Sequence, residues 1–514
     1  MASIKAYGRA EVTVPAGQSV FVASYGNGIT TVSGTVAPGN SVPRFMSLGT
    51  VSNNSSTFGP YAFDRTVRID AGPAEVEYSV GLAPEVRSKA TAYISALTNP
   101  YGFDMIGDSR TADLIIGNGL NSRNWFNQAC ARYNQVPLLI GAYGAAGKRS
   151  DQYLTNGNFE LALASTSKWL IFGYPAVNDI SQSATGYTDT FGRAITAGNV
   201  AAYACDNIIS YAKRAVSAGK SVIILTEAGA TTLAAAQVAS VHEFNRLLKL
   251  RIAEVPGAIL YDPCPLIWNA TSSATLIAFK TNFSGDGTHA QQMAARVVGI
   301  DFAQKVLPSL IPADDFTNAN ISDSVANGTN QIYRNPLFNT LTGGTAGGNF
   351  TLTSGNIPAN MTISGSASAG LAATITSAAN ASGYGNDITL NFSSTGAVGA
   401  RIDLTLTTTD WNLTDLLEGF IDMDVASGGT NVSGVYAEMM IQTDAGTNDL
   451  WANYSGNSGP MATTGDTGLR LRTRKGGVVS GSASKVAAQM RIWVLFSAAG
   501  SQSITLRRAQ IMRY

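Results

Sequence analysis

The stretch FDMIGDSR, residues 103 to 110, decides the fold of the central part of this chain. A short apolar run stops at Gly107 and opens into a polar turn that holds Asp108 and Ser109. This pattern is typical of a buried parallel strand that delivers a side chain to a cleft at its carboxyl end. Ser109 is therefore a candidate nucleophile, and a helix N-cap is the alternative role for a serine after a strand.

Four more apolar runs follow the first, and helical patterns separate them. The predicted strands are 103–107, 137–141, 168–173, 221–227 and 258–262. Parallel strands need a crossover connection, usually a helix packed on a face of the sheet. We therefore expect a three-layer α/β domain over residues 86–312, with a five-stranded parallel sheet and helices on both faces.

Period-two patterns rich in Val, Ile and Thr flank this region on both sides. Residues 1–85 predict a small antiparallel β domain. Residues 313–332 are mostly polar, which predicts a linker. Residues 333–514 contain eight or nine short strand patterns with Gly and Asn turns, which favour a two-sheet sandwich of jelly-roll type. The chain is thus predicted to be multidomain, as its 514 residues also suggest.

Charge and composition exclude several classes of function. Lys plus Arg equals Asp plus Glu, 34 of each, so net charge does not favour nucleic acid or an anionic membrane. The first residues lack the apolar core of a signal peptide, and no apolar run of 18 residues occurs, so we expect neither export nor membrane insertion. The three cysteines match no metal or redox spacing and are predicted to be buried apolar residues in a protein that folds in a reducing cytoplasm.

Only two histidines are present, and they differ in context. His242 lies inside a helical pattern, where a structural role is expected. His289 follows a Gly-rich turn, with Asp286 three residues before it. A carboxylate at that spacing can bond one imidazole nitrogen and fix the tautomer that a general base needs. Helix capping is the alternative role for Asp286.

Donors for an oxyanion are predicted after the second and third strands. Gly147 offers a backbone N–H and Asn178 an amide, which together with the N–H of Ser109 would form an oxyanion hole. An ordinary loop glycine and an Asx turn are the alternatives for Gly147 and Asn178.

Four blocks follow one another along the chain: GDS (107–109), Gly147, ND (178–179) and DGTH (286–289). Together they resemble the SGNH (GDSL-like) hydrolase family, over roughly residues 100–305. The resemblance implies a flavodoxin-like α/β/α fold. It also implies that Ser109 is the nucleophile, Asp286 and His289 complete a triad, and Gly147 and Asn178 are oxyanion donors.

Two departures from the family pattern concern the surroundings of the site. Ala176 stands where many members have a glycine two residues before the Asn, and Arg110 follows the GDS block where many members have Leu or Ile. Arg110 and Tyr174 are weaker candidates for substrate contact. The alternatives for Arg110 are a position in solvent or a pair with an acid.

The resemblance implies acyl transfer to a serine, a reaction that needs no cofactor and no metal. The isolated histidines leave no zinc site, and the pair Asp422 and Asp424 is too short a ligand set to indicate calcium. An exposed strand end is the expected role of that pair.

The N-terminal stretches VTVPAGQSV (12–20) and TVRIDAGPAEVEYSVG (66–81) resemble a small β module of tailed-bacteriophage virion proteins. The C-terminal part, which opens with RNPLFN (334–339) and closes with ITLRRAQIMRY (504–514), resembles the jelly-roll or carbohydrate-binding type. We therefore expect a tail spike or fibre that removes O-acetyl groups from bacterial surface polysaccharide. Its partners would be the acetylated glycan, other virion proteins bound through the N-terminal domain, and further copies of the chain, with a trimer favoured. The C-terminal domain would bind carbohydrate or form the trimer. Trp411, Trp451 and Trp493 could stack on sugars, although core packing is the better expectation for each.

Two alternatives stay open. One is a bacterial carbohydrate esterase with accessory glycan-binding modules. The other is a structural or receptor-binding virion protein, of tail or head, with an inactive hydrolase scaffold.

Overall fold

A computed structural model describes most of the chain, in two compact units. The described residues are 2–5, 7–15, 18–24, 30–35, 45–51, 55–58, 65–72, 76–80, 99–112, 115–116, 119–133, 138–190, 192–311, 331–368, 370–381, 385–452 and 465–514. The first unit comprises residues 1–112 and 139–278, and the second comprises 113–138 and 279–514. These two units have other bounds than the predicted domains.

The first unit begins with two four-stranded sheets of antiparallel strands, in the orders β1-β8-β3-β6 and β2-β7-β4-β5. Their bounds are β1 (Ala2–Ile4), β2 (Arg9–Val14), β3 (Val20–Ser24), β4 (Thr30–Thr35), β5 (Phe45–Val51), β6 (Ser55–Phe58), β7 (Arg65–Asp70) and β8 (Val76–Val80). Buried valines and isoleucines of both sheets form one core, because alternate residues of each strand face inward. The predicted antiparallel strands are observed here, and β1, β5 and β6 are additional to them.

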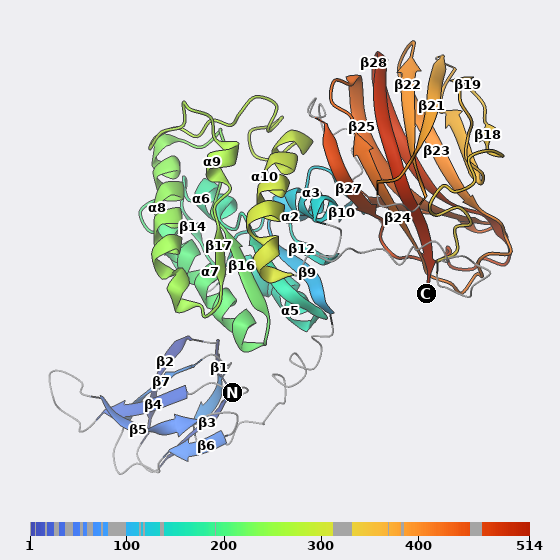
Figure 1. Ribbon diagram of the computed structural model, residues 1–514. Helices are drawn as coiled ribbons and strands as arrows, with labels where there is room; N and C mark the ends of the chain where they lie inside the picture. Colours follow the sequence, from blue (N-terminus) through green and yellow to red (C-terminus); the bar gives the residue numbers. More distant parts are fainter. Residues whose placement is uncertain are drawn as a thin grey trace. The chain divides into compact units, whose positions relative to one another are not determined.

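The five predicted central strands form one sheet in the order β12-β9-β13-β16-β17. Their bounds are β9 (Asn99–Gly107), β12 (Leu138–Gly144), β13 (Ser167–Gly173), β16 (Ser221–Leu225) and β17 (Ile259–Tyr261). The strands β9, β13, β16 and β17 pair in parallel. Numbered along the chain, the order is 2-1-3-4-5, which is the order of flavodoxin-like sheets. Figure 1 shows this sheet with α7 and α8 alongside it.

Helices connect the strands of the first unit. Their bounds are α2 (Ser109–Ala112), α4 (Gln152–Thr155), α5 (Asn158–Ala164), α6 (Val177–Gln182), α7 (Val200–Ser217), α8 (Ala235–Arg251), η1 (Ile252–Glu254) and α9 (Cys264–Ile267), with a short ribbon of β14 (Tyr187–Thr188) and β15 (Ala194–Ile195). Helix α5 packs on β9, and α7 packs on β16 and α8. The helix that the sequence predicts just after residue 86 lies outside the described residues.

The second unit contains an eleven-stranded sheet folded around one core. Its bounds are β18 (Thr345–Ala346), β19 (Phe350–Ser354), β20 (Met361–Gly365), β21 (Leu371–Ala379), β22 (Asn386–Ser394), β23 (Val398–Leu406), β24 (Leu417–Val425), β25 (Thr430–Thr443), β26 (Gly446–Ala452), β27 (Asp466–Arg472) and β28 (Lys485–Arg513). The sequence predicted most of these strands but missed β18, β24 and β26. The predicted linker lies largely outside the described residues, and its last residue, Ile332, instead donates its backbone N–H to Ile511 O of β28.

The strand β28 is 29 residues long, where two strands were predicted. The small residues around Gly500 had suggested a turn, yet the strand runs through them. Strands β22 and β23 pair along β28 in one unbroken register, with Ile388 opposite Leu506 and Val398 opposite Phe496. Strands β24 and β25 pair along its other edge.

The second unit also includes two helices that the sequence assigned to the hydrolase-like region. These are α3 (Trp125–Arg132) and α10 (Gln292–Lys305), accompanied by α11 (Leu307–Leu310), β10 (Ile115–Ile116) and β11 (Gly119–Leu120). Helix α3 packs on α10 and on β27. Arg132 and Arg296, one from each helix, pair with Asp466 at the start of β27 at 2.7 and 2.6 Å. This shared carboxylate explains why the helices group with the sandwich.

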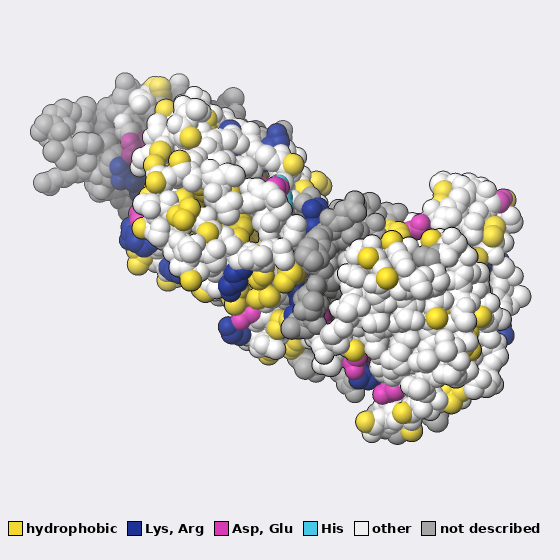
Figure 2. Space-filling model, turned by 90° about the horizontal axis from the view of Figure 1, so that it is seen from above, with side chains coloured by type: hydrophobic (Ala, Val, Ile, Leu, Met, Phe, Trp, Pro, Cys, Tyr) yellow, Lys and Arg dark blue, Asp and Glu magenta, His cyan; other side chains and the backbone are white. Residues whose placement is uncertain are grey.

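Charged side chains are sparse on the displayed surface. Figure 2 shows few Lys, Arg, Asp or Glu side chains on the face it displays, in keeping with a charged fraction of 13%. Within the described ranges, no helix has the length and apolar character needed to cross a membrane. The three cysteines are all buried, as predicted.

Candidate functional site

Ser109 lies directly after β9, at the point where the sheet reverses its strand order. Strand β9 has β12 on one side and β13 on the other. In sheets of this kind, ligands bind outside the carboxyl ends of the strands at such a switch point. Ser109 is partly exposed, whereas the preceding Asp108 is 1% exposed. The position is therefore the one at which this fold places reactive groups.

Glycines allow the strand ends to approach one another closely around Ser109. A Cβ on Gly107 would lie 2.8 Å from Gly173 O, at the end of β13. A Cβ on Gly144, at the end of β12, would lie 2.2 Å from the backbone nitrogen of Ala112. The predicted need for close backbone approach at Gly107 is thus confirmed, and Gly144 adds a contact that the sequence did not reveal.

The helix after Ser109 is shorter than expected. Helix α2 is a single turn of four residues, and the next helix in the chain, α3, begins at Trp125 behind its own N-cap Asn124. Asn124 accepts hydrogen bonds from two backbone N–H groups of α3. This helix therefore contributes little to stabilising negative charge at Ser109, since one turn carries little aligned dipole.

Arg110 pairs with acids inside the protein. Its side chain is 7% exposed, and its guanidinium lies 2.9 Å from Asp108 Oδ2 and 2.8 Å from Glu227 Oε1. Burial disfavours the charged form, but the two carboxylates outweigh it and raise the pKa of Arg110 above its ordinary value. Of the alternatives from the sequence, the pair with an acid is the one observed. A direct contact of Arg110 with substrate is correspondingly disfavoured, because its donors are already used.

Glu227 connects this ion pair to the loop that leads to Asn178. Its Oε2 accepts a hydrogen bond from the backbone N–H of Ala176 at 2.9 Å, and Arg110 donates to Tyr174 O in the same loop. Tyr174 has a φ of +50° and is 7% exposed, so its side chain is largely buried rather than presented to a substrate. Ala176 stands where the family pattern often has glycine, and Glu227 fixes its backbone directly.

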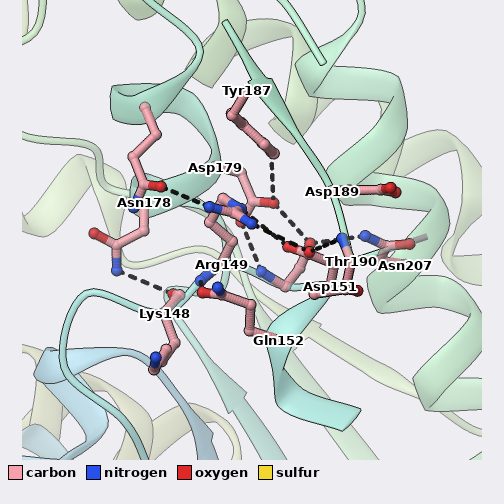
Figure 3. Close-up of polar contacts among 12 residues, drawn as sticks. Lys148, Arg149, Asp151, Gln152, Asn178, Asp179, Tyr187, Asp189, Thr190 and Asn207 are labelled. Atoms are coloured by element: carbon pink, nitrogen blue, oxygen red, sulfur yellow. Dashed lines mark hydrogen bonds and ion pairs between the residues drawn. The ribbon is translucent and has the colours of Figure 1, made fainter. Parts of the chain in front are cut away.

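Gly147 and Asn178 are brought together. Gly147 has a φ of +72°, in the left-handed region that favours glycine. Asn178 is in α6, and its Nδ2 donates to Lys148 O at 3.1 Å, as Figure 3 shows. An amide nitrogen carries two hydrogens, so this bond orients the side chain while the second hydrogen can serve an oxyanion. Both residues are exposed or partly exposed.

Asp286 and His289 form a hydrogen-bonded pair in the loop that leads to α10. His289 Nδ1 lies 2.6 Å from Asp286 Oδ2, and Asp286 Oδ1 accepts the backbone N–H groups of Thr288 and His289. Burial opposes ionisation of Asp286, but these hydrogen bonds outweigh it and hold its pKa well below the usual range. The N-cap of α10 is Gln291, so Asp286 does not cap the helix.

The predicted site residues thus fall into two groups. Ser109, Gly147 and Asn178 belong to the first unit, and Asp286 and His289 belong to the second. Each group has the internal geometry that acyl transfer requires of it: a serine beside converging strand ends, and an imidazole oriented by a carboxylate. The union of the groups into one triad stays a prediction.

Two buried acids near the site were missed by sequence reasoning. Glu227 is a polar residue at the end of a predicted strand, and nothing else in the sequence marks it as part of the site. Asp179 follows Asn178 directly, in the ND block, and is 0% exposed. Its position directly after Asn178 could have identified it as a candidate site residue.

Trp411 is buried, whereas Trp451 and Trp493 are partly exposed. Trp411 is 1% exposed and belongs to the sandwich core. Tyr436 stacks on Trp493 with ring centroids 6.1 Å apart, and the Arg401 guanidinium lies 5.8 Å from the centre of the same ring. Asp422 pairs with Arg470 at 2.6 Å, and Asp424 pairs with Arg507. In the part of the chain that the structure describes, no cluster of three metal-ligating side chains occurs.

No protein-family model matches the sequence, and no curated protein matches it either. Solved structures with similar folds include a GDSL-like lipase from Bacteroides thetaiotaomicron, at 14% identity over 43% of this chain and 98% of that chain, with a TM-score of 0.30. They also include a carbohydrate esterase family 2 enzyme with a carbohydrate-binding domain from Corynascus thermopiles, at 14% identity over 60% and 95%, with a TM-score of 0.29. A family two carbohydrate esterase from Clostridium thermocellum, crystallised with cellohexaose, is 11% identical over 60% and 94%, with a TM-score of 0.27.

Proposed function

We propose that this chain is a virion-borne serine esterase of SGNH type, which removes O-acetyl groups from bacterial surface polysaccharide. The observation that carries the proposal is the convergence of three strand ends on Ser109. Gly107 and Gly144 permit that convergence, and the loops beyond β12 and β13 supply Gly147 and Asn178. The hydrogen-bonded pair of Asp286 and His289 supports it independently.

In the proposed reaction, His289 takes the proton of the Ser109 hydroxyl as its Oγ attacks the ester carbonyl. The oxygen of the tetrahedral intermediate accepts hydrogen bonds from the N–H groups of Ser109 and Gly147 and from the Asn178 amide. The bond to the sugar oxygen then breaks, and His289 returns the proton to that oxygen. Water cleaves the acetyl-enzyme by the same route, which releases acetic acid and restores Ser109.

Asp286 keeps His289 in the tautomer that this reaction needs. A carboxylate on Nδ1 requires the proton of a neutral imidazole to sit there, so Nε2 presents a lone pair. The same carboxylate stabilises the imidazolium formed after proton transfer.

The virion location is supported by the resemblance of the N-terminal β module to modules of tailed-bacteriophage virion proteins. The resemblance of the C-terminal part to jelly-roll or carbohydrate-binding modules supports a contact with glycan. In this proposal the N-terminal module binds other virion proteins, and the second unit contacts the glycan or forms a trimer. Two alternatives remain. A bacterial carbohydrate esterase would carry out the same ester hydrolysis outside a virion. A structural or receptor-binding virion protein would have the same location but an inactive hydrolase scaffold.

The test is acetate release from O-acetylated capsular polysaccharide by the purified full chain. We expect release by the wild type, loss of release in Ser109→Ala, and labelling of Ser109 by a fluorophosphonate. Equal release by both proteins, or none by either, would contradict the esterase proposal. Mass spectrometry of purified phage particles separates a virion enzyme from a bacterial one, since only the former is found in particles.

A further inference from the structure

Asp179 has an environment that its sequence position alone does not explain. It follows Asn178 in α6 and is 0% exposed. Its Oδ2 accepts the backbone N–H of Ser150 at 2.9 Å, and its Oδ1 accepts the Ser150 hydroxyl at 2.8 Å. The Tyr187 hydroxyl lies 3.3 Å from the same Oδ1. One carboxylate therefore holds both the main chain and the side chain of Ser150.

Ser150 is the last of four consecutive residues that bond to α6. Figure 3 shows two of the four, Lys148 and Arg149, beside Asn178 and Asp179. Gln182 donates to Gly147 O at 3.2 Å, and Asn178 donates to Lys148 O at 3.1 Å. The Arg149 guanidinium donates to Gln182 Oε1 at 2.8 Å. We call residues 147–150 the Gly147 segment. Each residue of the segment is thus tied to the helix that carries Asn178.

These four connections differ in burial. The bonds to Gly147 O and Lys148 O are exposed, where water competes for the same groups and the net gain is small. The bonds between Asp179 and Ser150 are buried. In the low dielectric of the interior a hydrogen bond is stronger, and breaking it leaves an unpaired buried group. The Asp179 bonds are therefore the ones that fix the Gly147 segment on α6.

We propose that Asp179 is a positioning residue for ester hydrolysis: through Ser150 it sets the Gly147 segment relative to Asn178, and so aligns two of the oxyanion donors. The inference rests on the proposed function. Asp179 does not touch the substrate. It acts through the relative placement of two donors that stabilise charge developing only in the transition state.

A change at Asp179 should accordingly reduce kcat with little change in KM. A small displacement of catalytic donors can cost about a hundredfold in rate. For Asp179→Ala we expect kcat to fall by about tenfold to a hundredfold on p-nitrophenyl acetate. Asp179→Asn should recover most of the rate, because its amide oxygen still accepts the Ser150 N–H and the hydroxyl can accept from the amide nitrogen.

Asp189→Ala is the matched control. Asp189 is 5% exposed, lies in the same unit, and accepts the backbone N–H and the guanidinium of Arg193 and the Tyr203 hydroxyl. Neither of these partners belongs to the Gly147 segment. We expect comparable loss of stability and an unchanged kcat. A fall in kcat in Asp189→Ala equal to that in Asp179→Ala, or an unchanged kcat in Asp179→Ala, would overturn the proposal.

Hydrogen exchange separates failure of this inference from failure of the proposed function. If the wild type and Ser109→Ala hydrolyse the ester equally, the esterase proposal fails. The Ser150 amide should still be protected from exchange in the wild type and Asp189→Ala, and lose that protection in Asp179→Ala. Equal protection in all three would overturn the positioning role. If Asp179→Ala does not fold, Ser150→Ala is the second variant: it removes the Oγ bonds to Asp179 and Asn207 but keeps the bond from the Ser150 N–H to Asp179. It should show a smaller decrease in kcat, and an unchanged kcat would overturn the positioning role.

Discussion

Arg110 and Glu227 are 117 positions apart in the sequence and 2.8 Å apart in the structure, and neither side chain exceeds 7% exposure. The pair joins the turn of Ser109 to the loop that precedes Asn178. Removing one member of a buried ion pair leaves the other charge without compensation. The residue after the nucleophile is thus a structural support of the site.

We expect Arg110→Met to lower the free energy of unfolding by about 3–5 kcal/mol, because Asp108 and Glu227 would then face each other as buried, unpaired carboxylates. Urea unfolding measures the change. Arg246→Met, which breaks an exposed pair with Glu243, is the control and should leave stability nearly unchanged. Equal stability of the two variants would contradict the assigned role of Arg110.

Two glycines near the site should respond differently to the same substitution. Gly144→Ala places a Cβ 2.2 Å from the nitrogen of Ala112, so the turn of Ser109 must shift. We expect a loss of about 1–3 kcal/mol in stability together with a large decrease in ester hydrolysis. In Gly147→Ala the added Cβ meets open space, so the only cost is the positive φ, which should lower the free energy of unfolding by about 1 kcal/mol. Thermal unfolding and hydrolysis rates of both variants test this; similar effects of the two would count against the convergence of strand ends on Ser109.

Asp286→Asn should reduce ester hydrolysis while the chain stays folded. An amide can bond the imidazole in either orientation, so the tautomer with a proton on Nδ1 is no longer enforced. We expect kcat to fall by roughly 10²–10⁴-fold. Asp301→Asn, which breaks the ion pair with Lys305 within α10, is the control and should keep wild-type kcat. Unchanged kcat in Asp286→Asn would remove this pair from the proposed mechanism.

Asp179 should also give the protein a characteristic dependence of stability on pH. Burial raises its pKa from 3.8 to about 7, against the hydrogen bonds from Ser150, with Asp151 acting in the same direction as burial and Arg149 opposing it. Between these values the folded state binds more protons than the unfolded state, so the free energy of unfolding falls as pH rises from about 4 to 7. Urea unfolding of the wild type at pH 5 and pH 8 should show this loss.

Asp179→Asn, which cannot ionise, should lose less stability over the same interval. The difference between the two proteins isolates this one group from the other acids. Parallel pH profiles would show that the carboxyl group does not titrate in this range.

The central sheet could be predicted because its signal is local. Each strand is a continuous apolar run, and the residues that follow β9, β12 and β13 stand next to those runs in the sequence. The sequence predicts Ser109, Gly147 and Asn178 in this way, and it pairs Asp286 with His289 because they stand three positions apart. The hydrogen bond between Asp286 and His289 is observed, whereas the joining of the two groups into one site stays a prediction.

The supporting network could not be predicted, because its bonds join residues far apart in sequence. Nothing near Arg110 indicates Glu227. The grouping of α3 and α10 with the sandwich depends on Asp466, which lies 170 positions beyond Arg296. Likewise, small residues around Gly500 are typical of turns, and only the register with β22 and β23 shows that β28 continues through them.

The length of β28 has a consequence for how the sandwich is made. Its four partners, β22 to β25, all precede it in the chain, and Leu506 pairs with a residue more than a hundred positions earlier. During synthesis these partners leave the ribosome with their inner edges unpaired, and long-range pairings of this kind form slowly. Assembly of the sandwich must wait for its last strand. Nascent chains that stall before residue 485 should therefore be prone to aggregate, and the yield of folded protein should depend on how quickly the final segment is translated.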